Sequence, residues 1–401
     1  MKKRRVVITG IGAITPLGNS FRQSWDGLID GRCGLGTVEG RGCGRIASVG
    51  GEELQWERYL SQKQRRRLDP FIHYALVAAS MAIEDAAIDH AYVKDCAVIM
   101  GTSRGGVMRL NEAFYDINNH RRLSGYLMSG TTPGMAASYI SEVFGSRGYT
   151  LGISNACASG ANAVGEAYRL ISDGYAEMAV SGGSDAPLCD ICFMGYEACR
   201  ALSRRHVSSP FDTKRDGFVL SEGAAVLILE EYGRAFGRGA SIYAEISAYA
   251  NSSDGHNQVK PDNNTQAMAM LSAINIAGLT AGDIDHVNTH GSSTRLGDLS
   301  EATAIREVFK QTIDVLPITA NKSATGHMLA ASGAFELAVT AMTVREGVIP
   351  PTINVDDLDQ GCVMNLIREP VKMPVKAALS NSFGFGGTNA VIILKKCEDN
   401  V

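Results

Sequence analysis

Short runs of β-branched residues recur along the chain, and each run ends in a small or polar residue before an Ala-rich segment with helical spacing. A short apolar run bounded by turn residues is typical of a buried strand, whereas apolar residues three and four positions apart predict a helix. The alternation of these two patterns predicts an α/β fold. We expect strands at residues 6–9, 96–100, 150–154, 178–181, 286–289, 318–321, 377–380 and 390–394.

Two helix-like segments of equal length, 158–174 and 331–347, both open near an Ala-Ser-Gly-Ala sequence and close with Gly. A closing Gly suits the left-handed conformation that ends many helices. Because only two copies exist, a short Ala-rich match can also arise by coincidence. No linker or charge block separates the halves, so the repeat predicts one duplicated body with a site between its halves, which we place at 1–245 and 246–401.

The composition is that of a folded globular protein, with 45% hydrophobic and 20% charged residues among 401. A net charge of −4 argues against nucleic acid as a partner, and no apolar run is long enough to span a membrane. The basic residues 1–5 precede apolar ones as in a secretory signal, but Gly10, Gly12 and Pro16 interrupt the run, which we interpret as a strand. An odd number of cysteines, nine, indicates reduced thiols in a cytoplasmic protein.

Cys157 follows the expected strand 150–154 and stands at the start of the expected helix 158–174. Unpaired N–H groups and the positive end of the helix dipole favour a thiolate there, and a strand-to-helix elbow exposes a nucleophile. The position also suits a small buried hydrophobic residue, which is the usual environment of a free cysteine.

His290 and His327 each follow an expected strand and each lies in a polar loop. Catalytic groups of α/β proteins gather at such strand ends, so the two histidines and Cys157 can converge, although a structural role is common for a histidine. Their spacing matches no zinc module, and the pair Cys189 and Cys192 has no second pair, so we expect no metal.

The segment 384–389 reads Gly-Phe-Gly-Gly-Thr-Asn. Glycines around one aromatic residue permit unusual backbone angles and can leave an N–H free to complete an oxyanion hole. The alternative is a plain turn between strands. Gly10 and Gly12 begin a dinucleotide-binding pattern that Thr15 and Pro16 break, so no nicotinamide cofactor is expected.

In combination these motifs resemble the β-ketoacyl-acyl-carrier-protein synthases of the elongating, type II kind. The resemblance runs from 6–12 through 210–218 to 381–389, and the Cys, His-Gly-x-x-Thr and Lys-Ser-x-Thr-Gly-His motifs occur in the family's order. It implies the thiolase fold, in which two βαβαβαββ halves form five layers, α/β/α/β/α, and dimers form along the sheet edges.

The resemblance implies that Cys157 accepts an acyl chain as a thioester and that His290 and His327 face malonyl-acyl carrier protein. Loss of carbon dioxide from the malonyl group places negative charge on its thioester oxygen, which imidazole N–H groups in a dry site stabilise. The resulting enolate attacks the acyl thioester, in a decarboxylative Claisen condensation that requires no cofactor beyond the carrier's phosphopantetheine.

Other residues match supporting positions of the family. Lys322 and Glu336 match the charges that orient the second histidine, His327. The N–H groups of Cys157 and Phe385 would form the oxyanion hole, and Phe385 matches the gating aromatic residue. Ser292 and Thr294 match the hydroxyl groups that hold the pantetheine, although the family more often has Thr at the first of these.

A carrier protein is acidic, so a locally basic surface should receive it. Lys63, Arg66, Arg67 and Arg205 resemble the family's docking patch, although a basic stretch is also typical of a solvated helix face. The protein is expected to form a homodimer, or a heterodimer with a ketosynthase-like or chain-length-factor subunit.

Arg104 departs from the family, which places a small or aliphatic residue at the bottom of the acyl tunnel. A buried unpaired guanidinium is costly, so Arg104 shortens the tunnel, recognises a polar chain or pairs with an acid of the partner subunit. A short segment at 204–209 and Leu220-Ser221 before Glu222 are further departures. They favour a type II polyketide or polyene pathway over fatty-acid elongation.

His327 in the third catalytic place separates the chain from initiating synthases, which have Asn there, and 384–389 lacks the second cysteine of thiolases. Cys157 argues against a non-condensing chain-length factor. Two other functions stay open: a partner subunit that shapes a neighbour's cavity, and a Cys-His hydrolase.

Overall fold

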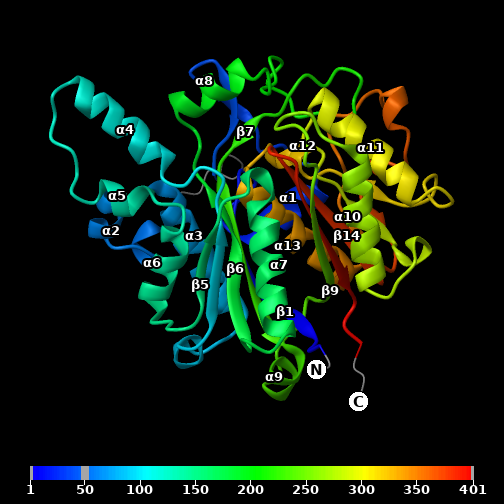
Figure 1. Cartoon of the computed structure of the whole chain (residues 1–401), viewed down its shortest axis with the longest axis horizontal. Helices are drawn as coiled ribbons and strands as arrows, with labels where there is room; N and C mark the ends of the chain where they lie inside the picture. The colour runs from blue at the N-terminus through cyan, green and yellow to red at the C-terminus, as the bar shows by residue number, and fades with distance from the viewer. Residues whose placement is uncertain (1–2, 47–53, 399–401) are drawn as a thin grey trace.

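The computed structural model describes residues 3–46 and 54–398. Its centre is a ten-stranded sheet that both halves of the chain build (Figure 1). The N-terminal half supplies β5 (Thr150–Ile153), β4 (Ala97–Gly101), β6 (Met178–Asp185), β8 (Gly223–Glu231) and β1 (Val6–Ile14), in that spatial order. The C-terminal half supplies β11 (Ile318–Thr319), β10 (His286–Asn288), β14 (Ala377–Gly384), β15 (Thr388–Lys395) and β9 (Ala244–Ser253).

The two halves have the same topology. If the sheet strands are counted along each half, both halves have the spatial order third, second, fourth, fifth, first. The pairings also agree, since β4 and β10 each run parallel to both neighbours, whereas β8 and β15 run antiparallel to theirs. The duplication is therefore confirmed. The boundary that we place after residue 245 stays a prediction, and β9 begins at Ala244.

All eight expected strands are present. The first strand of each half, β1 or β9, lies at the junction and links the two halves into one sheet. β1 pairs with β9, with Val6 opposite Ile246 and Ile8 opposite Ala244. β8 and β9 were not expected from the sequence.

The five sheet strands of each half form one β layer, and three apolar clusters lie between and outside these two layers. This arrangement gives the expected layers. The central cluster contains α7 (Ser159–Ser172) and α13 (Ala330–Glu346), which pack on each other and on strands of both halves. α3 (Pro70–Asp85) and α6 (Met135–Phe144) cover the outer face of the first half, and α10 (Asn263–Ile276) and α11 (Arg295–Val308) cover that of the second. Because α13 lies in the middle layer, nearly every one of its side chains is buried.

Shorter elements complete the fold around this core. They are α1 (Phe21–Ile29), β2 (Gly36–Val38), β3 (Arg41–Gly44), α2 (Gln62–Arg67), α4 (Val107–Asn118), α5 (Leu127–Thr131), α8 (Asp190–Ala198), β7 (Leu220–Ser221), α9 (Tyr232–Gly237), α12 (Lys322–Thr325), β12 (Val348–Ile349) and β13 (Val371–Lys372). In the parts of the chain that the structure describes, no helix has the length and apolar character needed to cross a membrane.

Candidate active site

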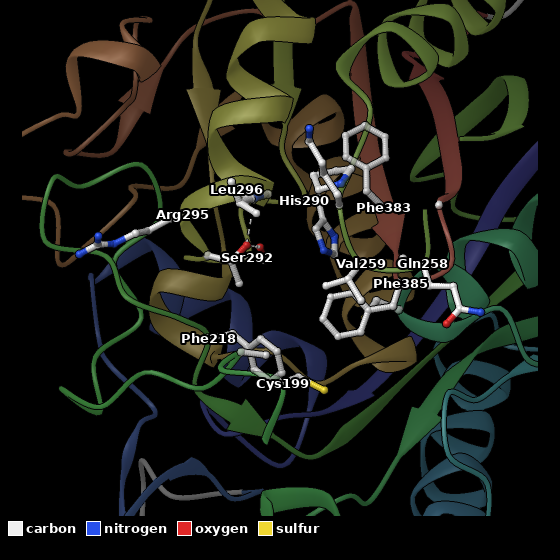
Figure 2. A pocket seen from close by; sticks show the side chains of 18 of the residues that line it. Cys199, Phe218, Gln258, Val259, His290, Ser292, Arg295, Leu296, Phe383 and Phe385 are labelled. Atoms are coloured by element: carbon white, nitrogen blue, oxygen red, sulfur yellow. Dashed lines mark hydrogen bonds between the residues drawn. The ribbon is translucent and has the colours of Figure 1, made fainter. Parts of the chain in front are cut away.

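Three chain segments bring Cys157, His290 and His327 to one cavity of about 250 Å³. Cys157 lies in a single 3-10 turn, Ala156–Ala158, between β5 and α7, and Ala156 has a left-handed φ of 48°. His290 follows β10, and His327 follows α12. Figure 2 shows His290 and the rings of Phe383 and Phe385 beside the opening of this cavity. The convergence expected from the sequence is therefore present in the fold.

The two imidazole rings lie edge to face, with centroids 5.3 Å apart. The backbone N–H of Leu329 donates to Nδ1 of His327 at 3.2 Å. Nδ1 of His290 faces Nζ of Lys322 at 3.3 Å, and an ammonium group only donates. Each Nδ1 is thus an acceptor, which assigns the ring proton of both histidines to Nε2.

Both histidines are neutral at physiological pH. Burial lowers the pKa of His290 well below its ordinary value, and the charges of Lys322 and of the other imidazole add to this effect. Burial and Lys322 likewise lower the pKa of His327. The site therefore holds two uncharged imidazoles that each have one Nε2–H group to donate.

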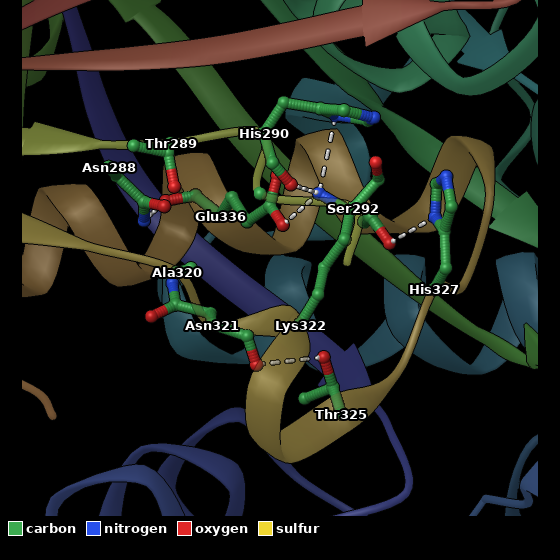
Figure 3. A network of polar contacts seen from close by, with 12 residues as sticks. Asn288, Thr289, His290, Ser292, Ala320, Asn321, Lys322, Thr325, His327 and Glu336 are labelled. Carbon is green, nitrogen blue, oxygen red and sulfur yellow. Dashed lines mark hydrogen bonds and ion pairs between the residues drawn. The ribbon is translucent and has the colours of Figure 1, made fainter. Parts of the chain in front are cut away.

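Lys322 and Glu336 form a buried ion pair against His290 (Figure 3). Nζ of Lys322 donates to Oε1 of Glu336 at 2.5 Å and to the carbonyl oxygen of His290 at 2.6 Å. The pair was expected to orient the second histidine, His327, and this expectation is wrong. Lys322 is the first residue of α12, and its ammonium group hydrogen-bonds to His290, which follows β10.

Burial raises the pKa of the Cys157 thiol to about 11, although Lys322 and the backbone N–H of Phe385 act in the opposite direction. The thiolate that we expected from the helix start is therefore not the resting form. The Phe385 N–H donates to this sulfur, which supports an oxyanion hole beside it. A Cβ on Gly384 would lie 3.0 Å from the Asn155 carbonyl oxygen, so glycine allows this close approach.

Ser292 and Thr294 line the same cavity, and their hydroxyl oxygens are 2.9 Å apart. Thr294 also caps α11 by accepting from the N–H of Gly297. Phe218 and Phe383, which lie in the segments 210–218 and 381–389 that carry the family resemblance, also line the cavity. Other lining residues lie outside the motifs found in the sequence: Tyr196, Asn257, Gln258, Val259 and Leu296.

Glu301 is a positioning residue that sequence reasoning missed. Its carboxylate accepts from the backbone N–H groups of His290 and Gly291, both at 2.8 Å, and from the Asn381 amide at 3.1 Å. Glu301 is buried on α11, and burial raises its pKa to about 7. These bonds fix the loop that presents the first imidazole. A single Glu within a polar helix gives no sequence signal of this role.

Arg104 is exposed on its own subunit, and its Nε donates to the Tyr196 hydroxyl at 2.9 Å. The cost that we expected for a buried unpaired guanidinium therefore does not arise within this chain. Tyr196 lines the cavity, so Arg104 lies next to its wall.

The four basic residues expected to receive a carrier protein are not among the described residues that line the cavity. Lys63, Arg66 and Arg67 lie on α2, beside α3 and α6, whereas α10 and α11 stand on the other side of the molecule (Figure 1). Arg205 is exposed and donates to the carbonyl oxygen of Lys214. Across the described ranges, no group of three or more His, Cys, Asp and Glu side chains is arranged to hold a metal ion.

Two family models match the chain: Beta-ketoacyl synthase, N-terminal domain, over residues 3–235, and Beta-ketoacyl synthase, C-terminal domain, over residues 243–356. The 3-oxoacyl-[acyl-carrier-protein] synthase 2 of Synechocystis sp. is 35% identical over 413 residues, which cover 99% of each chain.

Solved structures show the same likeness. The ishigamide ketosynthase/chain length factor has a TM-score of 0.92 at 28% identity, covering 99% of this chain and 100% of that one. A type II polyketide ketosynthase bound to the hexaketide, in complex with its acyl-carrier protein, has a TM-score of 0.90 at 28% identity and the same coverage. These matches confirm the thiolase fold.

Proposed function

This chain belongs to the β-ketoacyl synthase family as an elongating condensing enzyme, and we propose that Cys157, His290 and His327 carry out its reaction. The reaction joins a Cys-bound acyl group to malonyl-acyl carrier protein with loss of carbon dioxide. One observation carries the assignment of these residues: two neutral imidazoles, 5.3 Å apart, share a cavity with a thiol.

In the first half-reaction the Cys157 sulfur attacks the carbonyl carbon of an acyl thioester. The carbonyl oxygen becomes negative, and the N–H groups of Cys157 and Phe385 stabilise it. The C–S bond to the pantetheine then breaks, and the thiol proton leaves with the pantetheine sulfur. Because the resting thiol is protonated, this proton transfer is part of the loading step.

In the second half-reaction the malonyl carboxylate leaves as carbon dioxide, and its bonding electrons move to the thioester oxygen. The Nε2–H groups of His290 and His327 donate to that oxygen. Because both rings are neutral, they stabilise the negative charge that forms on this oxygen during the reaction but carry no charge that would hold a permanent anion. The enolate carbon then attacks the acyl carbonyl, the C–C bond forms and the bond to the Cys157 sulfur breaks. The sulfur leaves as a thiolate and takes a proton from solvent, which restores the resting thiol.

Both substrates reach the site on the phosphopantetheine of an acyl carrier protein, so no bound cofactor takes part. Ser292 and Thr294, whose hydroxyl groups lie next to each other in the cavity, would hold the pantetheine. Lys63, Arg66, Arg67 and Arg205 remain the proposed docking residues on each subunit of a homodimer or a heterodimer with a related ketosynthase-like subunit. One solved relative is a type II polyketide ketosynthase in complex with its carrier, which supports this partner.

Intact mass after incubation with acyl and malonyl carriers tests the proposal. Cys157→Ala should show no acyl adduct, whereas His327→Ala should load normally and lose decarboxylation of malonyl carrier by about 10²–10³-fold, the usual loss of one oxyanion donor. Cys33→Ser, at an exposed thiol, is the matched control. Normal loading of the alanine variant at 157 would exclude the proposal, and a chain that loads but forms product only with a second subunit would be half of a heterodimer.

A further inference from the structure

Cys189 and Cys192 form a close pair of thiols that the proposed reaction does not use. Cys189 is the N-cap residue of α8, and Cys192 lies in the first turn of that helix. Both are free thiols and nearly buried, at 7% and 5% exposure, and their side chains are hydrogen-bonded to each other. A Cys-x-x-Cys pair at a helix start is the arrangement of protein dithiols that exchange with disulfides.

The hydrogen bond within the pair favours a thiolate at Cys189. The hydrogen bond from Cys192 lowers the pKa of Cys189, and the same bond together with burial raises the pKa of Cys192. The charges of Asp69 and of Asp190, which Arg41 holds at 2.7 Å, oppose a thiolate at Cys189. At Cys192 the Arg104 guanidinium favours the anionic form and the buried Asp185 opposes it. The thiol of Cys157, in contrast, has its pKa raised to about 11.

We propose that Cys189 and Cys192 are a redox-active dithiol that closes to a disulfide under mild oxidation by a peroxide while Cys157 stays reduced. The Cys189 thiolate attacks one oxygen of hydrogen peroxide, the O–O bond breaks, and the departing hydroxide takes a proton to form water. Cys192 then attacks the resulting sulfenic acid sulfur, the S–S bond forms, and the S–O bond breaks with release of a second water. The peroxide is reduced, and both thiols are oxidised.

The pair is joined to the catalytic cavity through α8. Cys189, Cys192, Phe193 and Tyr196 form the buried side of this region, in one apolar cluster with Cys157. Tyr196 lies one turn beyond Cys192, lines the cavity and accepts the Arg104 hydrogen bond. A disulfide holds its sulfurs about 2.05 Å apart, closer than a hydrogen bond, so oxidation must tighten the start of α8 and displace this wall. This consequence for loading rests on the proposed function.

The test treats the full-length protein with hydrogen peroxide, blocks the remaining thiols with N-ethylmaleimide and maps the tryptic peptide 170–200. We expect a link between residues 189 and 192, a mass lower by two hydrogen atoms, and full reversal by dithiothreitol. Cys189→Ser and Cys192→Ser should each lose the link, and Cys33→Ser should keep it. The proposal is overturned if Cys157 oxidises first, if the link involves Cys199 instead, or if both thiols of the pair are still alkylated.

A second measurement separates this proposal from the proposed function. Acyl loading of Cys157 by the oxidised protein should slow several-fold and recover with dithiothreitol, and Cys192→Ser should show no such response. A disulfide that forms without changing the loading rate would refute the coupling to the cavity. Absence of loading in the reduced protein would instead refute the proposed function and leave the disulfide result standing.

Discussion

Replacing Lys322 by Met tests the buried ion pair and its catalytic role together. Lys322 is 1% exposed, and its ammonium group contacts the Glu336 carboxylate and both the carbonyl oxygen and Nδ1 of His290. Met keeps much of the length of the side chain but removes the charge and the donors. Glu336, also 1% exposed, then has no cation to offset its burial.

Breaking a buried ion pair by removing one partner costs about 3–5 kcal/mol, so the free energy of unfolding of Lys322→Met should fall by that amount. The pKa of Glu336, already raised to about 7 by burial, should rise further so that the residue stays protonated. Urea denaturation of Lys322→Met, Glu336→Leu and the double variant measures the coupling. Lys310→Met, at an exposed position, is the control and should change little.

The double variant separates stability from chemistry. Because an apolar pair of similar volume often replaces a buried ion pair at no loss, it should recover most of the lost unfolding free energy. It should not recover decarboxylation, because Nδ1 of His290 then has no fixed donor and the ring can turn its proton away from the substrate. A double variant that is no more stable than Lys322→Met, or that decarboxylates malonyl carrier like the wild type, would refute this reasoning.

Three further predictions concern the frame of the site. Burial raises the pKa of Asp69 to about 7, so its contribution to stability is complete below the unfolded value near 3.8 and is lost as the pH rises through 7. Asp69→Asn keeps the cap of α3 but cannot ionise. In urea titrations, the unfolding free energy of the variant minus that of the wild type should therefore be larger at pH 8 than at pH 5; an equal difference at both pH values would contradict this. Gly160→Ala should lower the unfolding free energy by about 1–3 kcal/mol or more, because the new Cβ would lie 2.1 Å from the Ala330 carbonyl oxygen, and unchanged thermal unfolding would contradict it. Gly384→Ala should lower the unfolding free energy, because its Cβ would lie 2.6 Å from Thr388 Oγ1. It should also load acyl groups about 10²-fold more slowly in intact-mass time courses, because it displaces the Phe385 N–H, whereas wild-type loading would remove that N–H from the mechanism.

Much of the fold follows from local patterns in the sequence. Eight strands lie where short apolar runs end in small or polar residues, and the two Ala-Ser-Gly-Ala segments are α7 and α13. β8 and β9 were missed; β8 leads into the short helix α9 and β9 into a loop, so no Ala-rich helix directly follows either strand. β14 and β15 also lack such a helix and were expected from their apolar runs alone. The pairing of β1 with β9 is likewise a contact between distant segments that no local pattern encodes.

Part of the site could also be predicted from local patterns in the sequence. Cys157, His290 and His327 follow strands at corresponding ends of the sheet, so topology brings them together. Whether Lys322 contacts His290 or His327 depends on which ring lies within a few ångströms of its ammonium group. The spacing of these residues in the sequence does not determine this. The protonation state of Cys157 was mispredicted because only the helix start, which favours a thiolate, was considered. Burial by the surrounding layers favours the neutral thiol.

The proposed decarboxylation depends on His290 and His327 being neutral rings that carry their protons on Nε2. Nitrogen-15 NMR of histidine-labelled protein measures this directly, with each signal assigned from its His→Asn variant. We predict that both rings show the neutral Nε2–H pattern and do not titrate between pH 5.5 and 8, where a histidine of ordinary pKa gains its charge. A ring at either position that titrates near pH 6.5, or that carries its proton on Nδ1, would contradict the account.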